Sequence, residues 1–564
     1  MKTKIACIFL SLLLCLVVLA NSLLLAHVHG TNPTSAYNTI QSEHTIMNLT
    51  LFATYEATHM IIDFDVNDVD GNGIFDIAVT DSPSASSGIV YLKVLQNNGK
   101  DLWNKTFSSM SLGNVRLVDL NKDNKADVIV AGRLGSETVY TYDSNGSLLW
   151  ARSLSNWVDG ISYGNFDSNE ELDVVAGTWG DIRAWNYSGG QLWQYTGTTF
   201  SSAPSDVVDL TGDNLDDVIV GTAWNDGRLH SLGSNGTLLW TFGPTSSNIQ
   251  GYAANLDGDY KSDVLAVSSD GYIRGIRSNG SLIWEKFVNW STILFEGLHT
   301  RPGSFLSDYN KDGRDDIIFS NKTQIHVLSG VDGAIINTID TTFNVTAGAV
   351  ADMDKDGVLD FIVAGDDGII YVLKGNGEII CNFAIGQQIT PLPYHPIGIA
   401  DMNTDGIPDI IAVANHTRLY VITSVDISPP KIGEPVRIPS DQVLPDQHVE
   451  IFVNVTDALS QVQSVFLYYR HNSTGAWSDW SQLVMQPTTG DTYKTTILNF
   501  TLGTCVEYYI NATDIVGNWA IAPAQAVYNY YVVPEYPQMI IPLLIMLLSA
   551  PAIIFMKRKS IGKS

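Results

Sequence analysis

The chain has 564 residues, more than a single hydrophobic core usually serves, so two or more domains are expected. Hydrophobic residues make up 45% of the sequence, which argues against an intrinsically disordered protein. The formal net charge is −28, with 59 acidic side chains against 31 basic ones. This excess of acid excludes nucleic acid as the expected partner, because phosphate binding needs clustered lysine and arginine.

The first thirty residues predict export. Lys2 and Lys4 precede an apolar run from Ile5 to Ala20, and small residues follow at positions suited to cleavage. This pattern is typical of a signal peptide over residues 1–30, and an uncleaved anchor helix is the alternative. Fourteen Asn-x-Ser/Thr sequons in the rest of the chain are consistent with an exported glycoprotein.

A nine-residue acidic pattern recurs eight times, with successive copies starting 44 to 53 residues apart. It has Asp or Asn at the first, third and fifth positions, usually Gly or Asn at the sixth, and Asp at the ninth. Each closing Asp runs into a short apolar stretch such as Val128–Gly132, which is typical of a buried strand.

A second repeat follows the acidic one. The segments 145–150, 189–193, 235–240 and 279–284 combine a Gly-containing turn with Leu and Trp. Asn-Gly between apolar stretches is a strong β-hairpin signal, because the tight turn needs positive φ. Each unit therefore has four strands, and such units repeated around an axis predict a β-propeller.

The eighth unit lacks its own fourth strand, whereas the segment Met47–Tyr55 precedes the first unit and reads as an unclaimed strand. Adding this segment to the last unit would close a ring and remove the open edges. We therefore expect an all-β chain whose residues 37–425 form an eight-bladed β-propeller, with seven blades as the alternative.

The acidic loops, with following strands such as Phe-Ile-Val-Ala-Gly at 361–365, resemble the FG-GAP (VCBS-type) repeats of integrin α-chain propellers over about residues 60–424. Independently of this resemblance, the alternating oxygen ligands suit Ca²⁺, which takes 6–8 oxygens in flexible geometry. An EF-hand is excluded because the expected flanks are strands and position twelve is Val363 in one copy. The resemblance further implies that the carbonyl of Val358 is a ligand, and we expect Gly357 to adopt a left-handed turn.

Several structural Ca²⁺ ions are thus expected, in five to eight of the loops, because some copies depart from the pattern at Thr211 or Glu170. The predicted ligands are Asp68, Asp70, Asn72 and Asp76; Asp119, Asn121, Asp123 and Asp127; Asn165, Asp167, Asn169 and Asp173; Asp209, Thr211, Asp213 and Asp217; Asn255, Asp257, Asp259 and Asp263; Asp308, Asn310, Asp312 and Asp316; Asp352, Asp354, Asp356 and Asp360; and Asp401, Asn403, Asp405 and Asp409.

Aromatic residues are expected at the blade end opposite the acidic loops. They are Trp157, Trp179, Trp224, Trp290 and Tyr394. Exposed rings there would stack on sugars or anchor a protein partner, and packing between neighbouring blades is the alternative. Cys381 occupies the slot of the hairpin Trp, so we expect a core residue. The segment Trp477–Ser481 matches the cytokine-receptor WSxWS motif, a match that we interpret as chance.

Residues 427–533 contain short alternating strands and resemble the Ig-like or fibronectin-III-like modules of prokaryotic surface proteins. In residues 534–564, an uncharged run from Met539 to Met556 precedes a basic tail, which predicts a transmembrane helix with a cytoplasmic end. With Val533–Pro537 before it, this end resembles a PEF-CTERM sorting signal and implies an archaeal source; Tyr536 stands where that motif has Phe.

The sequence therefore predicts a secreted, membrane-anchored cell-surface protein with its bulk outside the cell. We expect it to bind calcium and to act in adhesion, recognising an extracellular glycan or protein through the propeller face. No catalytic residues emerge, so we expect no enzyme. A polysaccharide-degrading enzyme of the lyase-like propeller type and a passive envelope scaffold are the alternatives.

Overall fold

The computed structural model describes residues 46–83, 88–133, 135–198, 202–223, 226–245, 248–259, 261–288, 293–294, 305–389 and 397–534. The predicted signal peptide, the transmembrane segment and the basic tail lie outside these described residues. Within the described part of the chain, no helix has the length and apolarity needed to cross a bilayer. Every named element there is a β-strand.

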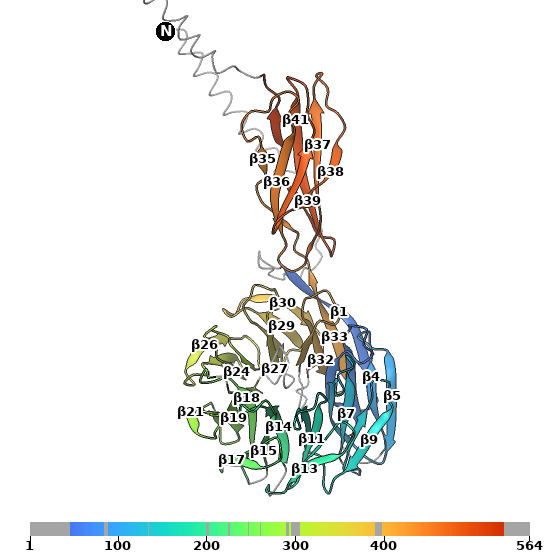
Figure 1. The fold of residues 1–564 in the computed structure, drawn as a ribbon, viewed down its shortest axis with the longest axis vertical. Helices are drawn as coiled ribbons and strands as arrows, with labels where there is room; N and C mark the ends of the chain where they lie inside the picture. Colours follow the sequence, from blue (N-terminus) through green and yellow to red (C-terminus); the bar gives the residue numbers. More distant parts are fainter. Residues whose placement is uncertain are drawn as a thin grey trace, which may run out of the picture. The chain divides into compact units, whose positions relative to one another are not determined.

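Eight antiparallel sheets occur among the described residues from Met47 to Asp426 (Figure 1). The first four contain β2 (Met60–Asn67), β3 (Asp76–Ser82), β4 (Ile89–Leu95) and β5 (Asp101–Ser108); β6 (Leu112–Val118), β7 (Asp127–Gly132), β8 (Thr138–Tyr142) and β9 (Leu148–Ser153); β10 (Gly160–Gly164), β11 (Asp173–Thr178), β12 (Asp181–Trp185) and β13 (Gln191–Tyr195); and β14 (Ser202–Val208), β15 (Asp217–Thr222), β16 (Leu229–Leu232) and β17 (Leu238–Phe242). The next three contain β18 (Ile249–Ala254), β19 (Asp263–Ser268), β20 (Tyr272–Ile276) and β21 (Leu282–Phe287); β22 (Ile293–Leu294), β23 (Leu306–Ser307), β24 (Asp316–Asn321), β25 (Gln324–Leu328) and β26 (Ile335–Asp340); and β27 (Val345–Ala351), β28 (Asp360–Gly365), β29 (Ile369–Leu373) and β30 (Ile379–Ala384). The last sheet contains β31 (Ile397–Ala400), β32 (Asp409–Ala414), β33 (Arg418–Asp426) and β1 (Met47–Glu56).

The second strand of a sheet lies between two hydrogen-bonded neighbours and is buried on both faces. In β7 and β28, for example, every residue is buried, and both strands read as continuous apolar runs after the first Asp. Such runs are expected where both sheet faces are covered. The fourth strands, such as β9, are only partly buried and carry exposed residues.

The first strands of neighbouring sheets contact one another. These contacts join β2 to β6, β6 to β10, β10 to β14, β14 to β18, β22 to β27, β27 to β31 and β31 to β2. The described chain is therefore all-β and built from repeated four-stranded antiparallel sheets, an arrangement consistent with a β-propeller.

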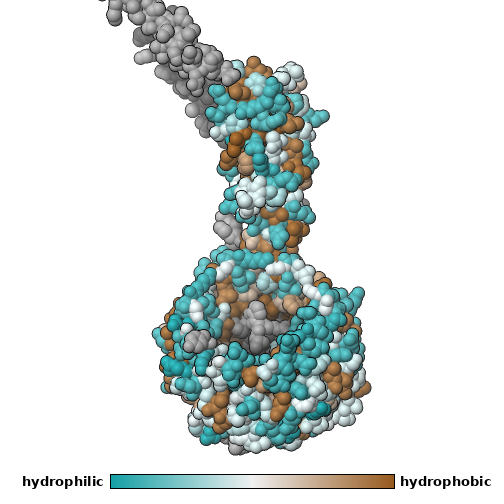
Figure 2. Space-filling model, in the orientation of Figure 1, coloured by the Kyte–Doolittle hydropathy of each residue, from teal (hydrophilic) through white to brown (hydrophobic). Residues whose placement is uncertain are grey.

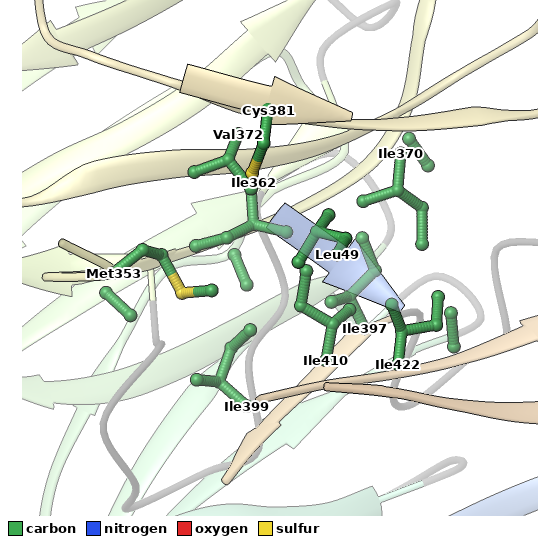
Figure 3. Close-up of a cluster of buried hydrophobic side chains, with 14 of the residues drawn as sticks. Leu49, Met353, Ile362, Ile370, Val372, Cys381, Ile397, Ile399, Ile410 and Ile422 are labelled. Carbon is green, nitrogen blue, oxygen red and sulfur yellow. The ribbon is translucent and has the colours of Figure 1, made fainter. Parts of the chain in front are cut away.

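The predicted closing strand is confirmed. β1 pairs antiparallel with β33 across nearly its whole length, from Met47 opposite Asp426 to Glu56 opposite Arg418. Figure 3 shows Leu49 of β1 among the side chains of β28, β29 and the last sheet. Cys381 is buried in the same cluster, which confirms that it is a core residue. The first and last segments of the eight-sheet region thus share one core.

The hairpin tryptophans join one sheet to the next. The indole N–H groups of Trp103, Trp150, Trp240 and Trp284 donate to backbone carbonyls in the hairpin turn of the following sheet, at 2.6–2.9 Å. The turn glycine lies directly against the ring, so a Cβ on Gly280 would come within 2.8 Å of Trp240. The recurrent Gly and Trp of the sequence are therefore one packing unit shared between neighbouring sheets.

The region after Asp426 contains two further five-stranded sheets. One holds β34 (Lys431–Ile432), β35 (Val436–Ile438), β36 (Val449–Thr456), β39 (Gln486–Pro487) and β40 (Thr492–Ile497); the other holds β37 (Val462–Asn472), β38 (Ser481–Val484), β41 (Cys505–Asp514), β42 (Trp519–Ala522) and β43 (Tyr528–Tyr531). Inward residues of β36 and β41 alternate with exposed or half-buried ones and form a common core.

The two tryptophans of the WSxWS-like segment contact side chains of β37 and β41, and the interpretation of the motif match as chance stays a prediction. The guanidinium of Arg470 lies 4.6 Å from the ring centroid of Trp477 and 4.7 Å from that of Trp480. Trp480 also meets Tyr509 edge to face at 4.9 Å. Cation–π contacts of this kind stabilise the exposed side of a sheet.

Candidate functional site

The acidic loops lie at one end of the sheets. Each loop connects the first strand of its sheet to the second, and the Gly-containing hairpin turns connect the third strand to the fourth. Because the strands are antiparallel, both connections fall at the same end. Strands and not helices flank the loops, which agrees with the exclusion of an EF-hand. All predicted ligand residues lie within the described part of the chain.

A common hydrogen-bond pattern holds these loops. The oxygen of the fifth residue accepts the backbone N–H of the seventh at 2.7–3.0 Å in every loop, as Asp356 does from Val358. In six loops, the first residue accepts the N–H of the sixth at 2.7–2.9 Å. The loops are therefore closed by their own side chains in a reproducible shape.

The closing Asp of each loop is buried at the start of the second strand. Its Oδ2 accepts the backbone N–H of the second loop residue in six loops, at 2.8–3.2 Å. Burial, as the largest cause, raises the pKa to about 6 for Asp76 and Asp217 and to about 7 for Asp127, Asp173, Asp360 and Asp409. A carboxylate at this position is destabilised unless a cation compensates it.

Oxygen atoms converge in the first and seventh loops. Carboxylate oxygens of Asp68, Asp70 and Asp76 lie within 4.8 Å of one another, as do those of Asp352, Asp354 and Asp356. Buried oxygens without a hydrogen-bond partner include Asp352 Oδ1, Asp360 Oδ1, Asp127 Oδ2 and Asp173 Oδ1. Oxygen donors of this number and spacing fit a hard cation such as Ca²⁺.

In two loops, a basic side chain from outside the loop pairs with predicted ligands, which the sequence did not predict. Lys374 Nζ lies 2.5 Å from Asp356 Oδ2 and 3.6 Å from Asp360 Oδ1, and it also pairs with Asp354. Arg277 Nε lies 3.3 Å from Asp257 Oδ2 in the fifth loop. Both residues directly follow the third strand of their sheet. An alignment of the eight units would therefore have shown a basic residue at this position in these two units. A bound cation in these loops would compete with an existing positive charge.

The backbone of the loops has a second left-handed position that the sequence did not predict. Gly357 adopts the predicted left-handed conformation, with φ of 80°. The fourth position is left-handed in every loop, although Lys, Ser or Thr occupies it in five of them, as in Thr404 with φ of 61°. Non-glycine residues rarely adopt this conformation, and tertiary structure must hold them there.

Two of the five predicted aromatic residues lie together at the opposite end of the sheets. Trp157 stands between β9 and β10, and Trp179 stands in the turn between β11 and β12. Their ring centroids are 6.2 Å apart, and the residues are 41% and 47% exposed. Trp224, Trp290 and Tyr394 lie outside the described residues. Figure 2 shows hydrophobic residues in small groups among hydrophilic ones on the face in view.

No family model matches the chain, so the FG-GAP resemblance stays a prediction. The chain is 29% identical over 119 residues to a λ-carrageenase of Pseudoalteromonas carrageenovora, and 30% identical over 119 residues to a λ-carrageenase of a Pseudoalteromonas species. Each match spans 21% of this chain and only 12% of the carrageenase.

Solved structures to which the chain is similar include BamB from Moraxella catarrhalis, with a TM-score of 0.42 and 15% identity over 66% of this chain and 99% of BamB. The V. cholerae biofilm matrix protein Bap1 has a TM-score of 0.34 and 14% identity, over 86% of this chain and 76% of that structure.

The expectation that the chain is not an enzyme is wrong in the light of these matches. Two relatives are polysaccharide-degrading enzymes, and the similarity covers a fifth of this chain. Residue spacing alone does not single out an acid, base or nucleophile, because carboxylates are abundant in the chain and their spacing marks only the acidic loops.

Proposed function

We propose that this protein binds an extracellular polysaccharide at the end of the sheets that carries Trp157 and Trp179. The observation that carries the proposal is the contact between these two exposed indoles, which come from neighbouring loops and lie 6.2 Å apart. Adjacent exposed rings offer flat apolar faces, on which the C–H faces of successive sugar units stack. The partial similarity to two λ-carrageenases supports a polysaccharide as the partner.

In this proposal the eight sheets are the eight blades of an FG-GAP-like propeller, and the acidic loops hold structural Ca²⁺. The loops and the aromatic pair lie at opposite ends of the strands, so the ions stabilise the scaffold without touching the sugar. Asp352, Asp354, Asp356 and Asp360 would hold one such ion, and their convergent oxygens support this role. The cation would offset the repulsion between neighbouring carboxylates.

The remaining parts of the proposal concern location. Residues 427–533 would form an Ig-like module, and residues 534–564 would anchor an exported protein in the membrane, as the apolar run and basic tail suggest.

The anchor is tested by detergent phase partition of the expressed chain. The full-length chain should enter the detergent phase, and a chain truncated after residue 533 should not. Recovery of both forms in the aqueous phase would contradict the anchor.

Cleavage of the bound polysaccharide is a second candidate function. The similarity to λ-carrageenases is the specific observation in its favour. A chain with many carboxylates offers acids and bases for such a reaction, but sequence and geometry assign none of them a catalytic role.

Polysaccharide binding is tested with the full-length protein in calcium buffer, using λ-carrageenan and a neutral galactan as probes. Replacing Trp157 and Trp179 by Ala should weaken retention of the polymer at least about tenfold, since a stacked aromatic contributes on the order of 1–2 kcal/mol. Trp519→Ala is the matched control, because Trp519 is exposed but lies in β42 of the second region. Retention unchanged by the double replacement would contradict the proposal.

The same samples decide between binding and cleavage. The chain length of the polymer is measured after incubation with wild-type protein and with calcium removed. Shortening establishes the enzyme, and retention without shortening establishes a binding protein.

A further inference from the structure

Three aspartates outside the acidic loops converge where the last strand of the eight-sheet region ends. Asp426 is the final residue of β33, Asp457 follows β36, and Asp514 is the final residue of β41. One carboxylate oxygen from each lies within 4.8 Å of the other two. All three aspartates lie in one compact unit of the described chain.

Hydrogen bonds from the following turn hold Oδ1 of each carboxylate. Asp426 Oδ1 accepts the N–H and the hydroxyl of Ser428 at 2.8 and 2.6 Å. Asp457 Oδ1 accepts the N–H groups of Leu459 and Ser460 at 3.1 and 2.9 Å.

Asp514 is fixed in the same manner. Its Oδ1 accepts the N–H groups of Val516, Gly517 and Asn518 at 2.6–2.9 Å. In all three residues the hydrogen bonds of the turn fix Oδ1, and in Asp514 the side chain of Asn518 also donates to Oδ2.

The second oxygens of Asp426 and Asp457 are buried and accept no hydrogen bond from a donor group, while the two carboxyl side chains face each other at hydrogen-bond distance. Asp426 is 2% exposed and Asp514 is fully buried. Among the described residues, no lysine or arginine forms an ion pair with the three carboxylates. Buried charges without partners are strongly unfavourable, because desolvation and mutual repulsion add.

The neighbouring polar groups do not supply the missing charge. Asn518 Nδ2 donates to Asp514 Oδ2 at 2.8 Å and to the Asp426 carbonyl at 3.1 Å, and an amide is neutral. Lys355 Nζ donates to the Leu459 carbonyl at 3.0 Å and not to a carboxylate. The cluster therefore has three acceptors and no cationic partner.

We propose that Asp426, Asp457 and Asp514 bind one divalent cation, Ca²⁺, which joins the end of β33 to two turns of the second region. The donors are all oxygen, which favours Ca²⁺ over metals that prefer nitrogen or sulfur. Water completes the coordination. The proposal is independent of polysaccharide binding and of the acidic loops.

The site has a structural consequence. Its ligands come from three segments, and Leu459, two residues after Asp457, is buried in the core cluster that contains Met353 and Ile407 of the eight-sheet region. The cation thus fixes the path of the chain after Asp426, where Pro429 and Pro430 follow. A calcium-depleted chain should lose this restraint before the sheets unfold.

The first test counts bound calcium per full-length chain by equilibrium dialysis at saturating Ca²⁺. The variant Asp426→Asn/Asp457→Asn should bind one ion fewer than wild type. Asp441→Asn, which changes an exposed aspartate of the same region, should bind as many ions as wild type. Equal counts for wild type and the double variant would overturn the proposal.

A second measurement uses the wild-type chain, so it does not require that a variant folds. Crystals of the wild-type chain are grown with Tb³⁺ in place of Ca²⁺, and anomalous density is calculated. A peak at about 2.3–2.6 Å from the three carboxylates is expected. Absence of a peak there, as would follow if the aspartates simply shared a proton, overturns the proposal.

Discussion

At the scale of single residues, Lys374 is the side chain that most changes the expected chemistry of the acidic loops. Its ammonium pairs with Asp354 and Asp356 and lies near Asp360 in the seventh loop. The residue pattern of this loop predicts a Ca²⁺ ion held by Asp352, Asp354, Asp356 and Asp360. The structure places the Lys374 ammonium group against these carboxylates, where it competes with a cation, and no residue pattern within the loop predicts this contact.

Replacing Lys374 by Gln should strengthen calcium binding to the seventh loop by about tenfold, which corresponds to about 1.4 kcal/mol. The reason is that the cation no longer has to displace a paired ammonium group from its ligands. Calorimetric titration of the full-length chain with Ca²⁺ measures the effect. Lys93→Gln is the control, since Lys93 pairs with Asp101 outside the loops. Weaker binding by the Lys374 variant would show that the lysine supports the site.

At the scale of elements, the contact between a hairpin Trp and the glycine turn of the next sheet links neighbouring sheets. The Trp240 indole lies where a side chain of Gly280 would be, and it donates to the Ser278 carbonyl at 2.8 Å. The turn glycine thus meets two requirements, positive φ and space for the ring. Sequence pattern predicted the turn and the Trp separately, but not their contact across sheets.

Gly280→Ala should lower the free energy of unfolding by about 2–4 kcal/mol, because positive φ costs about 1–2 kcal/mol and overpacking against Trp240 adds to it. Gly386→Ala separates the two causes. Gly386 also has positive φ, but no atom lies within 4 Å of its added Cβ, so only about 1–2 kcal/mol should be lost. Thermal unfolding followed by tryptophan fluorescence measures both. Equal losses would show that the ring moves aside without penalty.

At the scale of the whole molecule, the buried closing aspartates predict an unusual dependence of stability on pH. Their pKa values are raised by burial from 3.8 to about 6 in Asp76 and about 7 in Asp360 and Asp409. A group whose pKa is higher in the folded state than in the unfolded state stabilises the fold at pH values below its unfolded pKa. That stabilisation is lost as the pH rises through the folded pKa. Without a cation, the protein should therefore be more stable at pH 5 than at pH 8.

Calcium should reverse this order, because it binds the ionised carboxylates and its affinity falls as they become protonated. Melting temperatures of the full-length chain in chelator and in saturating Ca²⁺, at both pH values, provide the measurement. Greater stability at pH 8 than at pH 5 in chelator would contradict the role assigned to the closing aspartates.

What the sequence by itself determined is local and repeated. Eight acidic loops, the buried strands after them and the hairpin turns follow from residue spacing, because backbone conformation and strand burial depend on near neighbours. The pairing of β1 with β33 was also predictable, since only one unit lacked a strand and only one strand was unclaimed. The residues predicted as ligands lie in the connection between the first and second strands of each sheet or begin the second strand.

Tertiary structure alone decided which distant side chains meet. The convergence of Asp426, Asp457 and Asp514, the contact of Trp157 with Trp179 and the position of Lys374 join residues from separate turns or strands. The same holds for Arg470 between two indoles, which the motif match alone did not explain. Such contacts depend on how sheets and turns pack, and packing is a property of the whole core that residue spacing along the chain does not encode.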